Sequence, residues 1–409
     1  MSRTAPPARR RVLLAAGAAL AGLGLWRAWP EQGLRNPCLG PLPPQLAQHP
    51  LLRQAWAGLD AGQVWDMHVH LFPLAAGHEH GQGVLWEALG AVQRQFFRNA
   101  ACVGDAVDDA VYAARLGELA GALPAGAKLL LLALDACYDE QGRARPERTH
   151  VQVGNDACAA AAAALPTRFE WAASVHPYRA DAVVAVEQAR AQGARALKWI
   201  PAAQGIDPAS PRCDAVYRTL ARLDLPLICH AGSERAAPGD DALGNPLRLR
   251  RALGQGVRVV VAHCATMGQS RDLDRGEAGP WIDNFALFER LMEEPASRDL
   301  LFGDLAAVTQ SARVGPALAR IVERASEGGD WAGRLLNGSD YPLPAIMPLY
   351  SLRALVDLDL LEAAALPPLT AIRRHNALLF DFALKRALRY RGKALAARVF
   401  ETRRFFARA

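Results

Sequence analysis

The sequence has few lysines, no closely paired cysteines and no long hydrophobic run. Its seven cysteines include no C-x-x-C pair, so neither a zinc ribbon nor a disulfide framework is indicated, and we expect most thiols to be buried as small apolar side chains. Only four of the 47 basic residues are lysines. No uncharged run reaches the ~20 residues of a membrane-spanning helix. With 51% hydrophobic and 22% charged residues, the composition is that of a globular protein with a sizeable core.

Positive charge is concentrated at the two ends of the chain. Residues 1–29 hold five arginines and no acid, and residues 382–409 hold nine basic residues against Glu401 alone. Because the net charge of the whole chain is only +6, residues 30–381 are net acidic. We therefore expect no nucleic-acid binding by the body of the protein.

Residues 1–29 have the pattern of a targeting segment. Residues 9–11 are all arginine and precede the uncharged stretch 12–26, which as a helix is too short for a ~30 Å hydrocarbon core. Tandem arginines before a short apolar run are typical of a twin-arginine export signal, and the flanking tryptophans also suit a retained anchor. We expect a signal or membrane-anchor segment here, and a location in a bacterial cell envelope, either periplasmic or anchored to the inner membrane.

The segments on either side of the body differ in composition. Residues 30–60 are rich in proline and are predicted to form a linker. In residues 382–409, apolar side chains recur at helical spacings between arginines and lysines, which predicts a basic amphipathic helix. Such a helix either docks on the acidic body or binds an anionic membrane surface, where each basic residue contributes ~1 kcal/mol. Its apolar positions are Leu384, Leu388, Leu395, Val399 and Phe406.

Eight short apolar segments recur through residues 61–381, and amphipathic helical stretches fill the gaps. Near-continuous apolar runs are typical of parallel strands buried on both faces. Eight strand and helix units in strict alternation predict an α/β fold of the (β/α)8 TIM barrel type. The strands are expected at 64–70, 128–135, 169–176, 194–200, 225–231, 257–263, 300–306 and 334–340.

Polar residues gather at or near the C-terminal ends of these predicted strands. Barrel enzymes build their sites on that face. Five of the ten histidines are in this group, which isolated structural histidines do not explain. The group consists of His68, His70, His176, Lys198, His230, His263, Asp304 and Asp340.

His68 and His70 are two residues apart on the first predicted strand, so both side chains point to one face, the barrel interior. By the same alternation Asp66 is expected to point with them at a deeper level. A lone H-x-H pair is weak evidence, but further histidines and an aspartate on later strands strengthen it. Imidazole and carboxylate ligands suit zinc and similar first-row metals, so the sequence predicts a divalent metal site.

Several stretches resemble the amidohydrolase-2 branch of the amidohydrolase superfamily, which consists of metal-dependent barrel enzymes. They are WDMHVH, ALKWIP, ICHAG, AHC, GSDYP and HNALLF, and they run through the whole predicted barrel. The resemblance implies that His68, His70 and Asp340 bind one divalent metal, most often zinc. It also implies that His230 is a fourth ligand or binds a second metal, and that His263 binds this second metal or hydrogen-bonds the attacking water.

Lys198 bears on the number of metals. An ammonium inside a barrel loses its solvation and has to be neutralised, paired or modified. For members with two metals, the resemblance implies a carboxylated lysine that bridges both ions. Alternatively, Lys198 stays a cation and binds a carboxylate or phosphate of the substrate. The sequence leaves both alternatives open, and with them one or two metal ions.

The favoured function is a hydrolase, in which a metal-activated water attacks a small amide, ester or lactone. Asp340 would accept the proton of this water, and His263 and Lys198 complete the expected catalytic group. His176 and Asp304 are predicted to contact the small-molecule substrate or to support the metal ligands. The resemblance implies an alternative, a metal-dependent decarboxylase of an unsaturated or aromatic acid. A non-catalytic binding barrel would be expected to lack ligands, and none is missing.

Overall fold

The computed structural model describes residues 30–71, 90–103, 109–235 and 237–407. The predicted signal or anchor segment at 1–29 lies outside these residues. Within the described part of the chain, no helix is long and apolar enough to cross a membrane.

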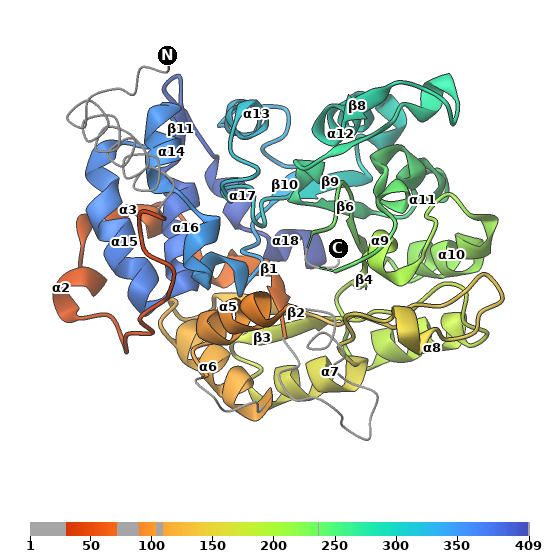
Figure 1. The fold of residues 1–409 in the computed structure, drawn as a ribbon, viewed down its shortest axis with the longest axis horizontal. Coiled ribbons are helices and arrows are strands. Elements are labelled where there is room, and N and C mark those ends of the chain that lie inside the picture. Colours follow the sequence, from red (N-terminus) through yellow and green to blue (C-terminus); the bar gives the residue numbers. More distant parts are fainter. Residues whose placement is uncertain (1–29, 72–89, 104–108, 236, 408–409) are drawn as a thin grey trace, which may run out of the picture.

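Eight parallel strands form the centre of the molecule (Figure 1). They are β1 (Trp65–His70), β2 (Lys128–Leu132), β3 (Phe169–Ala172), β4 (Leu197–Trp199), β5 (Leu227–His230), β6 (Val259–Ala262), β9 (Leu301–Asp304) and β10 (Leu335–Leu336). Two sheets, β1-β2-β3 and β10-β9-β6-β5-β4, supply them. Parallel bridges from Ala173 to Leu197 and from Val69 to Tyr341 join these sheets at both seams. Strand pairing therefore runs around a full circle, as in the predicted (β/α)8 barrel.

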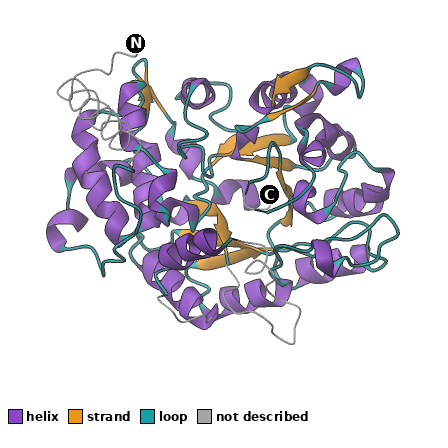
Figure 2. Ribbon diagram, in the orientation of Figure 1, coloured by secondary structure: helices purple, strands orange, loops and turns teal. Residues whose placement is uncertain are grey.

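Helices surround these strands (Figure 2). Those between and after the strands are α5 (Ala91–Ala101), α6 (Asp109–Gly121), α7 (Asn155–Ala164), α8 (Ala182–Ala191), α9 (Pro201–Gln204), α10 (Asp214–Arg222), α11 (Arg250–Gly254), α12 (Asn284–Glu293), α13 (Pro316–Arg324), α14 (Leu352–Asp357), α15 (Leu366–His375) and α16 (Ala377–Ala387). Asn376 caps α16, since its Oδ1 accepts hydrogen bonds from the backbone N–H groups of Leu378 and Leu379. A hairpin of β7 (Gln269–Arg271) and β8 (Trp281–Asp283) follows β6, which the alternation did not predict.

The strands bury both of their faces. Leu129 and Leu131 point outward into the main core beneath the helices, whereas Leu130 and Leu132 point into the barrel. The interior therefore has an apolar layer of its own below the strand ends. Its members on or next to the strands are Trp65, Met67, Leu130, Leu132, Ala172, Ala196, Ile228, Val260 and Leu336.

One extra residue in β1 separates this apolar layer from the polar strand ends. The register with β2 shifts after Asp66, which is a β-bulge, and a bulge re-aims the side chains that follow it. Met67 therefore belongs to the apolar layer, while its neighbour His68 belongs to the polar end of the barrel. The side chain of Asp66 consequently does not point to the same side as those of the two histidines, contrary to the expectation from the sequence. Its carboxylate accepts hydrogen bonds from the backbone N–H groups of His68 and Ser339 instead.

The segment 382–409 is not the predicted amphipathic helix. After α16 the chain forms a hairpin of β11 (Arg389–Tyr390) and β12 (Lys393–Ala394), then two short helices, α17 (Ala397–Phe400) and α18 (Arg403–Phe406). Phe406 joins the barrel interior and stacks on Trp65, with ring centroids 5.6 Å apart. Because all five apolar positions of the predicted stripe are buried in the body, they are not available to a membrane surface.

Residues 30–60 do not behave as a free linker. They include α2 (Pro44–Ala47) and α3 (Pro50–Trp56), and Trp56 stacks on Phe382 of α16 with ring centroids 4.2 Å apart. Glu31 accepts hydrogen bonds from the backbone N–H groups of Leu352 and Arg353 at the start of α14. The proline-rich composition therefore reflects helix starts and turns in a segment packed on the body.

A disulfide also fixes this segment, joining Cys38 to Cys102 at the end of α5. The cysteine spacing did not indicate it, because the two residues are 64 apart in sequence and belong to no local motif. The other five cysteines are buried free thiols, as expected.

Candidate metal centre

The predicted ligands meet at the C-terminal end of the barrel. Oδ1 of Asp340 lies 3.2 Å from Nε2 of His70 and 3.6 Å from Nε2 of His68. Its Oδ2 lies 3.9 Å from Nε2 of His263. The ligand atoms of His68, His70 and Asp340 all lie within 4.8 Å of one another, and such a donor set suits a divalent first-row metal.

The loop after β10 brings Asp340 this close to β1. A Cβ atom at Gly338 would lie 2.8 Å from Cβ of His68, so the close approach requires glycine there. Asp340 itself has a φ of 63°, in the left-handed region that is uncommon outside glycine and clusters at functional sites. The backbone geometry of the site therefore depends on the sequence Gly338-Ser339-Asp340.

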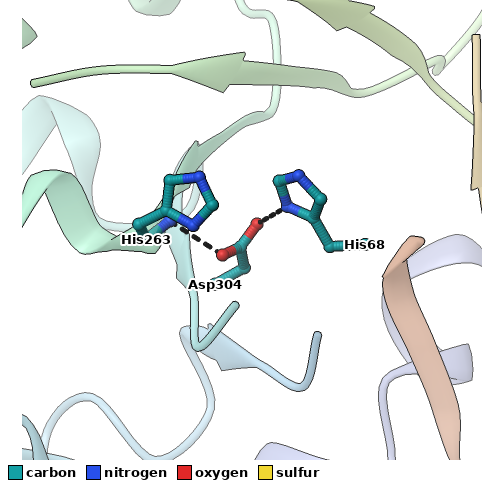
Figure 3. Close-up of side chains that lie close together, drawn as sticks. All are labelled: His68, His263 and Asp304. Atoms are coloured by element: carbon teal, nitrogen blue, oxygen red, sulfur yellow. Dashed lines mark hydrogen bonds and ion pairs between the residues drawn. The ribbon is translucent and has the colours of Figure 1, made fainter. Parts of the chain in front are cut away.

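The rings of His68 and His263 are each held by a hydrogen bond at Nδ1. Figure 3 shows the bond from His68 to Asp304, together with the bond from the backbone N–H of His263 to the same carboxylate. Nδ1 of His68 donates a hydrogen bond to Oδ2 of Asp304 at 2.8 Å. Nδ1 of His263 donates to the carbonyl oxygen of Ala306, also at 2.8 Å. Both rings therefore keep an unprotonated Nε2 on the side of Asp340. Partners of this kind fix the tautomer that binds a metal.

Asp304 supports the ligands and does not face a substrate. Its Oδ1 accepts hydrogen bonds from the backbone N–H groups of His263 (2.8 Å) and Ala306 (3.0 Å), and its Oδ2 is taken by His68. Burial acts to raise the pKa of Asp304, but the charges and hydrogen bonds of the two histidines hold it below its usual range. Of the two predicted roles, the geometry favours support of the ligands.

The protonation states match those that bind a metal. Burial lowers the pKa of His230 to about 4 and also lowers the pKa values of His68 and His263. Burial acts in the opposite sense on Asp340, yet the neighbouring histidines keep the pKa of its carboxyl well below the usual range. At neutral pH the centre thus offers neutral imidazoles and an ionised carboxylate.

Lys198 points from β4 into the same centre. It is fully buried, and its Nζ lies 3.3 Å from Nε2 of His68. Burial lowers the pKa of Lys198, against the attraction of Asp304 and Asp340. An ammonium beside a metal-binding nitrogen is repelled by a divalent ion, so metal binding favours an uncharged or carboxylated Lys198.

His230 contacts His263 and Glu234 at the same end of the barrel. Its ring meets that of His263 edge-on with centroids 5.2 Å apart, and its Nε2 lies 3.4 Å from Oε2 of Glu234. Nδ1 is buried and has no hydrogen-bond partner among the described residues. A buried polar atom of this kind calls for a metal or a water. Glu234 escaped the sequence analysis because it lies in the loop after β5, outside any recognised motif.

His176 takes a structural role in place of the predicted contact with substrate. Its Nδ1 accepts a hydrogen bond from the backbone N–H of Tyr178 at 3.2 Å, and its Nε2 donates to the carbonyl of Gln204 at 3.0 Å. Both ring nitrogens are therefore occupied. Burial lowers the pKa of His176 to about 4, which keeps the ring neutral.

A comparison with protein families identifies the family of the chain. A family model described as Amidohydrolase matches residues 65–378, from the first residues of β1 into α16. The chain belongs to the amidohydrolase family. The matched range contains every candidate ligand of this amidohydrolase, and the resemblance seen in the sequence is confirmed. A search of curated proteins found no significant match.

Solved structures resemble this amidohydrolase at low identity. An uncharacterised TIM-barrel protein from Bordetella bronchiseptica is 17% identical with a TM-score of 0.46, over 72% of this chain and 94% of that one. A Pseudomonas putida protein assigned as a 2-pyrone-4,6-dicarboxylic acid hydrolase is 15% identical with a TM-score of 0.42, over 78% and 97%. The 5-carboxyvanillate decarboxylase of Sphingomonas paucimobilis is 13% identical with a TM-score of 0.41, over 70% and 90%.

Proposed function

We propose that this amidohydrolase is a metal-dependent hydrolase of a small amide, ester or lactone. The observation that carries the proposal is the meeting of His68, His70 and Asp340, with a neutral His68 and an ionised Asp340, at the C-terminal end of a closed barrel. A bound divalent metal would supply a water whose pKa falls toward ~7 and would polarise the scissile carbonyl.

The protein's own groups have distinct roles in this proposal. Asp340 accepts the proton of the attacking water and passes it to the leaving group, since its carboxylate lies among three imidazoles and stays ionised. His263 orients the water through Nε2, because its Nδ1 is already committed to the backbone. Asp304 holds His68 in the required tautomer.

We propose zinc as the metal, because the ligands are imidazole nitrogens and carboxylate oxygens. Carboxylation of Lys198 is our proposed route to a second ion. It is supported by the position of its Nζ beside His68 and by the unpartnered Nδ1 of His230. Intact-mass and peptide analysis of the native protein should show the mass of one added CO2 on Lys198, together with two metal ions per chain. An unmodified lysine with one ion would favour the single-metal form.

The decarboxylase remains a second candidate, supported by Arg313, a buried cation in the loop between β9 and α13. Its guanidinium would hold the carboxylate of an acid. Product analysis separates the two reactions, since a decarboxylase releases CO2 from the acid and consumes no water.

The metal site is tested by elemental analysis of the purified protein. We expect one or two divalent ions per chain and loss of hydrolysis of an ester, lactone and amide panel after treatment with a chelator. The double variant His68→Ala/His70→Ala should bind no metal at this site. His375→Ala is the matched control, because this histidine lies on α15 at the surface and contacts the carbonyl of Gly40. Full metal content in the double variant would disprove the site assignment.

A further inference from the structure

Arg313 is a buried cation at the polar end of the barrel. It lies in the loop between β9 and α13 and is only 8% exposed. Its Nη1 donates a hydrogen bond to Oγ1 of Thr266 at 3.3 Å. The same Oγ1 donates to the carbonyl oxygen of His263 at 2.8 Å. One side chain thus joins the guanidinium to a residue of the candidate metal centre.

Among the described residues, none neutralises the charge of Arg313 with an ion pair. Within the described ranges, its Nε is buried and has no hydrogen-bond partner, and no carboxylate lies within ion-pairing distance. The acids that influence it are Asp340, Glu234 and Asp304, and each of these carboxylates contacts an imidazole. A guanidinium cannot lose its proton, so a buried and unpaired one is costly unless an anion binds to it.

Two further buried polar atoms on the neighbouring loops have no hydrogen-bond partner among the described residues. Thr309 lies four residues before Arg313, and Tyr350 lies in the loop after β10. Oγ1 of Thr309 and Oη of Tyr350 are both buried with no hydrogen-bond partner in the part of the chain that the structure describes. The two loops lie side by side, because the backbone N–H of Ser311 donates to the carbonyl of Leu349 at 2.8 Å. Unused hydrogen-bonding groups are therefore concentrated in the loops that follow β9 and β10.

We propose that Arg313, assisted by Tyr350, binds an anionic group of the substrate, a carboxylate or a phosphate adjacent to the reacting bond. This inference rests on the proposed function and narrows its substrate class to small organic anions. The planar guanidinium pairs with such groups through parallel hydrogen bonds. Its burial strengthens the pairing, because little solvent is left to screen it.

Lys198 does not fill this role in the described structure. Its Nζ lies 3.3 Å from Nε2 of His68, among the ligand atoms, whereas Nη1 of Arg313 is hydrogen-bonded to Thr266. A metal at the centre and an anion at Arg313 would thus occupy different positions. A substrate with both a hydrolysable bond and an acidic group would reach both.

The test is calorimetric titration of the metal-loaded protein with benzoate, isophthalate, inorganic phosphate and neutral benzamide. The proteins are the wild type, Arg313→Met, Arg313→Lys and the control Arg320→Met, whose side chain pairs with Glu289 on the outer helices. We expect Arg313→Met to bind at least one anion about 10- to 100-fold more weakly than the wild type. The anion affinity of Arg313→Lys should lie between those of the wild type and Arg313→Met. The affinity for neutral benzamide should be the same in all of these proteins. Preference for phosphate or for the carboxylates identifies the type of anion.

Equal binding of every anion by wild type and Arg313→Met, including no binding by either, would overturn the inference. Metal content is measured on each protein, so that a variant that misfolds is recognised. Tyr350→Phe, which removes only the hydroxyl, should cause a smaller loss in the same direction. If the protein holds metal and hydrolyses neutral esters but its anion binding does not depend on Arg313, the subsite alone is disproved. If anions bind through Arg313 but no metal is found, the proposed function fails and the subsite stands.

Discussion

The carboxylate of Asp304 accepts a hydrogen bond from Nδ1 of His68, at 2.8 Å, and so decides which nitrogen of His68 faces the centre. Neither residue is exposed. The carboxylate is anchored in turn by two backbone N–H groups. A rigid carboxylate behind a histidine both orients the ring and makes it a better ligand.

Asp304→Asn should therefore weaken metal binding. An amide cannot accept from His68 and from the two backbone N–H groups at once without turning its NH2 toward one of these donors. We expect metal affinity to fall by about 10- to 100-fold, measured by competition with a chelator of known affinity. Asp357→Asn, at the surface end of α14, serves as the control. Unchanged affinity in Asp304→Asn would contradict the role assigned to this residue.

Asp340→Asn keeps the shape of the side chain and removes its basicity. Turnover should fall by a factor on the order of 10² or more, because the proton of the attacking water then has no acceptor. The comparison is made at saturating metal, with metal content and circular dichroism recorded, so that loss of the ligand and loss of the base are separated. Turnover at the wild-type rate would rule out Asp340 as the base.

The C-terminal segment should contribute to stability in place of membrane binding. Phe406 is buried in the barrel interior against Trp65, and removal of a buried aromatic ring costs about 3–5 kcal/mol. Phe406→Ala should lower the free energy of unfolding in urea by that amount, while metal content at low temperature stays unchanged. Arg404→Ala, on the exposed side of the same short helix, should have little effect. Equal stability of the two variants would show that Phe406 is not part of the core.

The barrel could be predicted because its information is local. Each buried parallel strand is a continuous apolar run, and each polar residue at its end is adjacent to that run in sequence. The eight strands therefore lie where the runs predicted them, and His68, His70 and Asp340 meet as the resemblance implied. The bulge after Asp66 was not predictable in this way, because it depends on pairing with β2.

The parts that were missed depend on contacts distant in sequence. The apolar residues of 382–409 recur at helical spacing, but their side chains are buried in the barrel interior and against the outer helices. This burial does not require a continuous helix. Cys38 and Cys102 are brought together only by folding. Arg313 is one of many arginines in the sequence, and only its burial and its unpaired Nε distinguish it.

His176 gives a prediction about pH. Its folded-state pKa is lowered from 6.5 to about 4 by burial, so between these values the unfolded chain binds the extra proton. The stability contributed by the neutral ring is fully present above pH 6.5 and is lost as the pH falls toward 4, by about 3 kcal/mol in total. The difference in unfolding free energy between wild type and His176→Gln should therefore shrink between pH 7 and pH 4.5. Parallel pH profiles for the two proteins would contradict this assignment.

The disulfide between Cys38 and Cys102 connects stability with location. Structural disulfides persist in oxidising compartments, and together with the arginines at 9–11 this supports our proposal that the protein is exported to the cell envelope. In cells, the wild-type protein should fractionate with the envelope and carry an oxidised pair, scored by thiol alkylation before and after reduction. Replacing the three arginines with Gln should hold the protein in the cytosol with both thiols reduced. The double variant Cys38→Ser/Cys102→Ser should unfold at a lower urea concentration, because its free energy of unfolding should fall by about 2–4 kcal/mol. A cytosolic wild type with free thiols at both positions would refute the proposed location.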